Sequence, residues 1–135
     1  MTTPSPRILK SVPYRRVPDL PRAVAFYTDQ LGFEAIQTIA DTEGRPFFVI
    51  VRRGEATQML SSRPVHHRDR LMWIYVDNVD AAHRELVIAG ADIPFPPTDQ
   101  PHGNREFLVE DPAGETLVFA QILVESRMLE GSPKS

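Results

Sequence analysis

Two stretches of the chain are related to each other, "VPDLPRAVAFYTDQLGFE" (Val17–Glu34) and "VDNVDAAHRELVIAGAD" (Val76–Asp92). The aligned pairs are Val17 with Val76, Asp19 with Asn78, Leu20 with Val79, and Gly32 with Gly90. Several matches at nearly constant offset, with a period of about sixty residues, indicate two copies of one structural unit.

Each copy predicts a strand, then a helix, then three strands. Asp19 and Asn78 are suitable N-caps, because a side-chain oxygen there can accept from free N–H groups of the first helical turn. The predicted helices are Leu20–Leu31 and Val79–Ala89, with apolar residues at helical spacing. The predicted strands are Lys10–Val17, Glu34–Ile39, Phe47–Arg52, Ala56–Ser61, Leu71–Val76, Asp92–Phe95, Arg105–Glu110 and Glu115–Leu123.

The order βαβββ, twice, predicts an α+β protein of two modules, residues 8–62 and 71–123. Residues 63–70, which include His66 and His67, are expected to form a polar surface linker. The segment Pro94–Gly103 is rich in proline and predicts a long loop. The ends, residues 1–7 and 124–135, are expected to be disordered tails.

Composition excludes several classes of function. The formal net charge of -3 gives no basic footprint for nucleic acid. The chain has no cysteine, which removes disulfides, thiolate metal sites and cysteine nucleophiles. No apolar stretch is long enough to cross a bilayer, and the first residues lack a signal-peptide pattern. A cytoplasmic protein without membrane or nucleic-acid partners is therefore expected.

The two βαβββ units, the "FY" and "LGF" of the first copy and the terminal "DPAG" turn together resemble the vicinal oxygen chelate superfamily. This superfamily includes glyoxalases, extradiol dioxygenases and bleomycin-resistance proteins, and the resemblance covers about Ile8 to Leu123. It implies that the modules form an open, curved, mixed half-barrel with the helices on the outer face. It also implies a small-molecule ligand in a concave cavity and a homodimer.

Metal-binding members of this superfamily place one ligand on each of four strands. Carried over to this chain, the four positions hold Val12, Gln58, Leu71 and Val118. Metal ions require imidazole, carboxylate or other lone-pair donors, and only Gln58 offers one, a neutral amide. The sequence therefore predicts no metal site of the family type, and no cofactor.

The register of the last hairpin decides which side chains share a face. A type I turn over Asp111–Gly114 predicts that Glu110 pairs with Glu115. Continuing that ladder places Arg105 and Phe107 on the same face as Val118, away from the helices.

The inward face of the modules is then rich in aromatic and polar groups, as a small-molecule pocket requires. The candidate ligand-binding residues are Tyr14, Arg16, Phe48, Gln58, Leu60, Trp73, Tyr75, His102, Arg105 and Phe107. The alternative is that Trp73 and Tyr75 fill a core and that the arginines pair with Asp or Glu.

The favoured hypothesis is a metal-independent binding protein that sequesters a planar or aromatic molecule, as bleomycin-resistance proteins do. No catalytic residue is then required. The inward arginines would disfavour a cationic drug. Two alternatives remain. One is a lyase, isomerase or dioxygenase of the same fold, which requires either a metal site at other positions or metal-free acid–base work by Tyr14, His102 or Arg105. The other is an interaction module whose sheet face binds a partner.

Overall fold

The computed structural model describes residues 5–63 and 70–123. The described chain forms two compact units, one of residues 12–63 and one of residues 5–11 together with 70–123. The predicted linker histidines, His66 and His67, lie outside the described residues, as do most of the two predicted tails. None of the helices in the described ranges is long and apolar enough to span a membrane.

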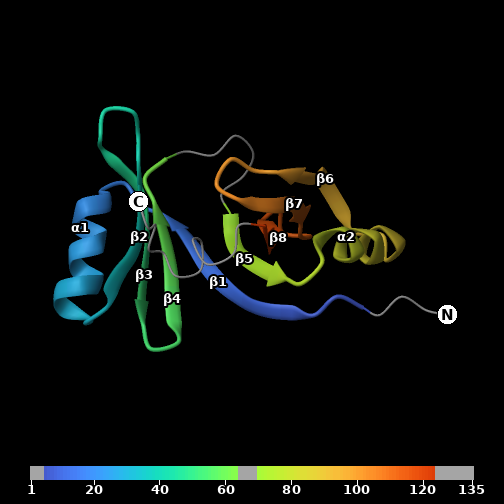
Figure 1. Cartoon of the computed structure of the whole chain (residues 1–135), viewed down its shortest axis with the longest axis horizontal. Coiled ribbons are helices and arrows are strands. Elements are labelled where there is room, and N and C mark those ends of the chain that lie inside the picture. The colour runs from blue at the N-terminus through green and yellow to red at the C-terminus, as the bar shows by residue number, and fades with distance from the viewer. Residues whose placement is uncertain (1–4, 64–69, 124–135) are drawn as a thin grey trace. The chain divides into compact units, whose positions relative to one another are not determined.

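The unit of residues 12–63 contains a four-stranded sheet in the order β2-β3-β4-β1 and one helical segment (Figure 1). Strand β1 pairs with β4 in parallel, and the other neighbours are antiparallel. Its elements are β1 (Ile8–Arg16, which begins in the other unit), α1 (Leu20–Ala25), the π-helix η1 (Phe26–Gln30), β2 (Glu34–Ala40), β3 (Pro46–Arg53) and β4 (Ala56–Ser61).

The second unit repeats this arrangement, with the strand order β5-β8-β7-β6. The parallel pair is β5 with β8, and the two hairpin pairs are antiparallel. Its elements are β5 (Arg70–Val76), α2 (Val79–Ile88), β6 (Asp92–Asp99), β7 (Asn104–Glu110) and β8 (Thr116–Ile122). The α+β class and the two βαβββ units, each with an open mixed sheet, are therefore confirmed.

Both predicted N-caps are confirmed. The carboxylate of Asp19 accepts from the backbone N–H of Arg22 at 3.1 Å, and the amide oxygen of Asn78 accepts from that of Ala81 at 3.0 Å. The predicted first helix, however, is not uniform, because α1 passes into a π-helical turn at Phe26.

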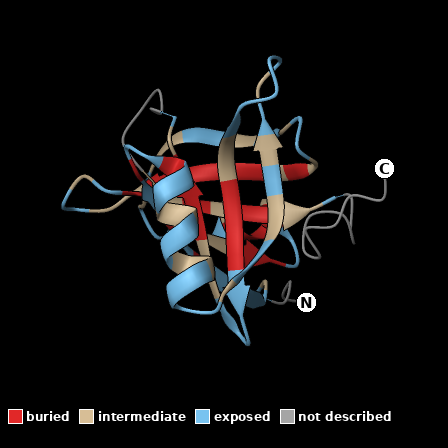
Figure 2. Cartoon of the chain, turned by 90° about the vertical axis from the view of Figure 1, so that its left-hand side faces the viewer, coloured by how far each residue is buried: buried red, intermediate tan, exposed pale blue. Residues whose placement is uncertain are grey.

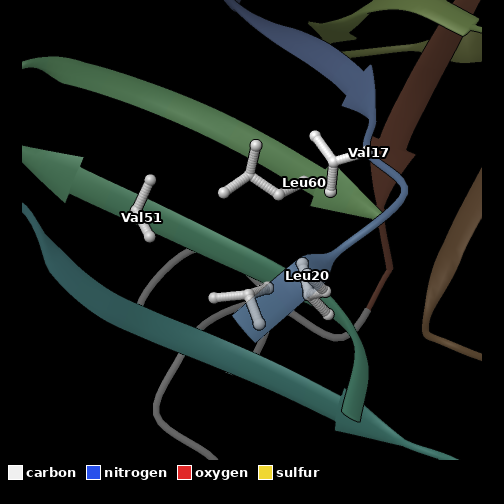
Figure 3. Close-up of a cluster of buried hydrophobic side chains, with 5 residues drawn as sticks. Val17, Leu20, Val51 and Leu60 are labelled. Atoms are coloured by element: carbon white, nitrogen blue, oxygen red, sulfur yellow. The ribbon is translucent and has the colours of Figure 1, made fainter. Parts of the chain in front are cut away.

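Each helix covers one face of its own sheet and forms a core there. Under α1 the core consists of Val17, Leu20, Val49, Val51 and Leu60 (Figure 3). Under α2 it consists of Val76, Val79, Ala82, Phe107 and Val109. Figure 2 shows that burial is concentrated in the strands, whereas α1 is largely exposed.

The prediction of a loop over Pro94–Gly103 is wrong for its first part, because β6 continues to Asp99. Proline lacks the N–H that a central strand needs, but it is tolerated at a sheet edge. Strand β6 is the edge strand of its sheet, and its pairing with β7 has irregularities on both sides of Phe95. The prolines of this strand therefore need not break it.

The predicted register of the β7–β8 hairpin is wrong by one residue. Glu110 pairs with Thr116, and the extra residue sits in the turn, where the N–H of Asp111 donates to the carbonyl of Glu115. Gly114 has φ 88°, as in a three-residue hairpin loop that ends in a glycine bulge. As a result, Leu108 rather than Phe107 lies opposite Val118.

Candidate functional site

The face of the second sheet opposite α2 combines two aromatic side chains with a carboxylate. Across β5, β8 and β7, one row runs from Trp73 through Val118 to Leu108. The next row runs from Tyr75 through Ala120 to Glu106. Because paired residues of neighbouring strands share a face, these side chains form one surface, here called the Trp73 face.

A buried carboxylate organises the Trp73 face. Glu106 is 9% exposed, and its Oε2 atom accepts three hydrogen bonds. The donors are Nε1 of Trp73 at 3.0 Å and Nδ2 of Asn104 at 3.1 Å, and Nε2 of His102 lies at 2.9 Å. Trp73 comes from β5, and His102 comes from the turn before β7, so Glu106 fixes two side chains that are far apart in sequence.

The electrostatics of the cluster favour a charged carboxylate. Burial alone raises the pKa of Glu106. The hydrogen bond and charge of His102 lower it, as do the hydrogen bonds from Trp73 and Asn104. Together these outweigh burial, so the pKa of Glu106 is lowered. Burial, followed by the nearby charge of Glu106, raises the pKa of Tyr75 well above its ordinary value. Tyr75 is therefore a neutral hydroxyl at physiological pH, and Glu106 is an anion.

A cation already lies on this face. The ammonium nitrogen of Lys10 is 5.3 Å from the centre of the Tyr75 ring, within the range of a cation–π interaction. Lys10 belongs to the same unit, in the part of β1 that precedes Val12.

Three of the predicted site residues, Trp73, Tyr75 and His102, meet around Glu106. Two others, Arg105 and Phe107, do not, and their predicted inward orientation is wrong. The bulge at Gly114 shifts the ladder by one residue and turns both toward the opposite face. Phe107 is 1% exposed in the core under α2, where its ring stacks on that of Phe119 at 5.1 Å.

Arg105 is held by two carboxylates on the helix side. Its guanidinium donates to Asp99 at 2.9 Å and to Asp80, near the start of α2, at 3.2–3.3 Å. These two hydrogen bonds, Asp99 first, raise the pKa of Arg105. The alternative in which this arginine pairs with aspartates is therefore the one that the structure supports.

In the unit of residues 12–63, Tyr14 and Arg16 lie opposite Met59 and Ser61 of β4, and Phe48 also lies opposite Ser61. These three predicted residues share the face away from α1. Gln58 and Leu60 do not, and their predicted inward orientation is wrong. Leu60 is fully buried in the core under α1, and the amide of Gln58 donates to the backbone carbonyls of Pro13 and Met59.

The error in β4 has a physical cause. Arg53 pairs with Ala56 around a two-residue loop, whereas the β7–β8 loop has three residues and a bulge. The repeat also aligns "GEATQML" (Gly54–Leu60) with "GETLVFA" (Gly114–Ala120), which matches Gln58 to Val118. Because the two loops differ, this alignment misplaces β4 by one position. In register, Met59 rather than Gln58 is the counterpart of Val118, since Tyr14 pairs with Met59 as Trp73 pairs with Val118.

The residues at the four family metal positions do not fit a metal ion. Val12 and Val118 are buried valines, and Leu71 has no donor atom. If the metal position on β4 is assigned to Met59, as the observed register requires, it offers only a thioether, which hard divalent ions do not favour. Within residues 5–63 and 70–123, no three His, Asp or Glu side chains are grouped so as to hold a metal ion.

Sequence reasoning missed Glu106 and Asn104. Glu106 lay within the predicted strand Arg105–Glu110, and Asn104 lay just before it. The signal was the alternation of both residues with Leu108 in "NREFLVE". With the turn read as a three-residue loop, that alternation would have placed one carboxylate and one amide on the Trp73 face.

These observations define an α+β protein of two βαβββ units with an acidic, aromatic sheet face. The chain belongs to the Glyoxalase/Bleomycin resistance protein/Dioxygenase superfamily, whose family model matches residues 10–119. Comparison with curated proteins gives no significant match.

Solved structures share the fold. A superfamily member from Vibrio splendidus 12B01 has a TM-score of 0.62 at 20% identity, over 83% of this chain and 97% of its own. The methylmalonyl-CoA epimerase from Mycobacterium tuberculosis has a TM-score of 0.67 at 16% identity, over 90% and 93%. An NAD-dependent benzaldehyde dehydrogenase from Legionella pneumophila has 0.67 at 19%, over 84% and 99%. At such identities the likeness shows the fold alone.

Proposed function

We propose that the protein is a metal-independent small-molecule binding protein that sequesters a planar or aromatic compound against the Trp73 face. The observation that carries this proposal is the fixed indole of Trp73, whose N–H is held by the buried Glu106. A rigid aromatic side chain offers a large apolar area for stacking at little entropic cost. Sequestration needs no further chemistry, which resembles the role of the antibiotic-resistance members of the superfamily.

The indole supplies the test, because Trp73 is the single tryptophan of the chain. We expect a panel of planar aromatic compounds to contain members that quench its fluorescence and raise the melting temperature. For such a compound, Trp73→Ala should weaken binding, measured by calorimetry, by about 1–3 kcal/mol, since a stacked anchor is lost.

Two variants make this result specific. Trp73→Phe keeps a ring but loses the N–H to Glu106, so it separates stacking from the positioning of the carboxylate. Phe26→Ala removes a half-exposed aromatic ring from the other unit and should leave affinity unchanged. Full affinity in Trp73→Ala, or no binder in the panel, would contradict the proposal.

Metal independence has its own measurement. We expect the purified protein to hold far less than one Zn, Ni, Fe or Mn per chain by elemental analysis, and its ligand affinity to survive chelation. The reason is the donor set, because Val12, Leu71 and Val118 supply no ligand atom. A stoichiometric metal that chelators remove together with ligand binding would show this expectation to be wrong.

A second candidate function is an enzyme of the same superfamily. The observation in its favour is the pair of Glu106 and His102, 2.9 Å apart, since a buried carboxylate with an imidazole partner can move a proton. Mass spectrometry of a bound panel compound after prolonged incubation separates the two functions. Unchanged compound supports sequestration, and a converted product supports catalysis.

The assembly and location of the protein are also proposals. The family resemblance supports a homodimer, and the absence of a signal-peptide pattern in the sequence is the ground for a cytoplasmic location. Light scattering coupled to gel filtration would show whether two chains associate.

A further inference from the structure

The Trp73 face carries a negative charge where the sequence suggested positive ones. Arg105 points to the helix side and is neutralised by Asp80 and Asp99. Glu106 takes its place on the aromatic face, 9% exposed and ionised. An ion of this sign in a largely buried position disfavours anionic ligands, because like charges repel strongly where water is scarce.

The cluster also has more hydrogen-bond acceptors than donors. Trp73, His102 and Asn104 all direct their N–H groups to the Oε2 atom of Glu106. Among the described residues, no donor reaches the second carboxylate oxygen, Oε1. A carboxylate can accept about four hydrogen bonds, so Glu106 has capacity that its neighbours do not use.

Asn104 provides a second acceptor without a partner among the described residues. Its side chain is 1% exposed, its Nδ2 donates to Glu106, and its Oδ1 has no hydrogen-bond partner within the described part of the chain. A buried acceptor without a partner is costly, and it is frequently satisfied by a bound water or ligand. Two neighbouring side chains thus present unused acceptors beside the indole of Trp73.

The protein already places one cation on this face. The ammonium group of Lys10 lies over the ring of Tyr75, two residues along β5 from Trp73. Tyr75 and Glu106 both pair with Ala120, so ring and carboxylate are on the same face. A positively charged group is therefore compatible with these surroundings.

We infer that Glu106, through its Oε1 atom, anchors a positively charged N–H donor group, such as an amidinium, on a planar ligand that stacks against Trp73. This inference rests on the proposed binding function and names its ligand class. The carboxylate fixes the orientation of the ligand, and the indole of Trp73 supplies the contact area. Asn104 orients the carboxylate by its hydrogen bond to Oε2.

The test uses three nearly isosteric probes, 2-naphthamidinium, 2-naphthamide and 2-naphthoate, titrated into the wild-type full chain by calorimetry. A hydrogen bond to a buried charge predicts that the amidinium binds at least about tenfold more tightly than the amide. The naphthoate should bind more weakly still. Equal affinities, or a preference for the naphthoate, would overturn the inference without any variant.

A matched pair of variants assigns the effect to one residue. Glu106→Gln keeps the size of the side chain and removes its charge, so the preference for amidinium over amide should shrink to about twofold or less. Glu115→Gln removes one charge from an exposed position of the same unit and should keep the full preference. An unchanged preference in Glu106→Gln, with a normal circular dichroism spectrum, would refute the assignment.

The outcomes separate this inference from the proposed function. If uncharged aromatic compounds bind and depend on Trp73 but the amidinium gains nothing, the binding function stands and the anchor is wrong. If no aromatic compound binds, including the three probes, both are wrong.

Discussion

Phe107→Ala is expected to destabilise the protein by about 3–5 kcal/mol, the usual cost of truncating a buried phenylalanine. The ring is 1% exposed, stacks on Phe119 with an interplanar angle of 10°, and meets His83 of α2 edge-on at 5.3 Å. Removing it leaves a cavity under α2 that its strand neighbours cannot fill. Urea unfolding followed by circular dichroism measures the loss.

A second phenylalanine provides the control. Phe95 on the edge strand β6 is 47% exposed, and Phe95→Ala should cost less than about 1 kcal/mol. If Phe107 instead lined the ligand face, its truncation would weaken ligand binding and cost little stability. Such a result would mean that the register of β7 and β8 is wrong.

The repeat makes the fold predictable from sequence. Caps at Asp19 and Asn78 and the helical spacing that follows them are local signals, because each depends on residues within one or two turns. The same local signals failed only where the backbone departs from a regular form. The π-helical turn at Phe26 and the proline-containing edge strand β6 are such places.

The orientation of the site residues was less predictable, because it depends on the exact number of residues in a turn. Glu110 pairs with Thr116 instead of Glu115, and this one additional residue between the paired positions reverses the facing of every side chain in β7 relative to β8. That single residue exchanged Arg105 and Phe107 for Glu106 and Leu108 on the Trp73 face. The predicted facing of β5 residues such as Trp73 and Tyr75 was unaffected, because it does not depend on the length of a hairpin turn.

The partners of Glu106 could not be found from sequence for a different reason. Trp73 lies 33 residues away, and the contact exists only because β8 lies between their two strands. From the local sequence alone, a glutamate in an apolar strand is predicted to face solvent. Only the three-dimensional arrangement shows that three N–H donors offset the free-energy cost of burying this carboxylate.

Glu106→Leu is expected to cost about 3 kcal/mol of stability at pH 7, since it strips three partly buried donors of their common acceptor. These donors, on Trp73, His102 and Asn104, then lack the charge that compensated their removal from water. Glu115→Leu, at an exposed position in the turn, should change stability by no more than about 0.5 kcal/mol. A loss in Glu106→Leu no larger than that of this control would mean that the cluster contributes nothing.

The acid dependence of stability provides a second measure of the same carboxylate. Because the folded pKa of Glu106 is below 4.5, the unfolded chain takes up this proton at higher pH than the folded chain does. The contribution is therefore complete above about pH 4.5 and is lost as the pH falls through the folded pKa. Urea midpoints between pH 7 and pH 3 should fall less steeply in Glu106→Gln than in the wild type.

Some acid dependence should remain in that variant. The pKa of Asp41 is also lowered, mainly by the backbone N–H of Arg45 in the β2–β3 turn, and this group titrates in the same range. The difference between the two curves, rather than either slope, reports Glu106. Parallel curves for wild type and Glu106→Gln would show that the carboxylate is not stabilised by folding, and its hydrogen bonds to Trp73 and His102 would then have no energetic weight.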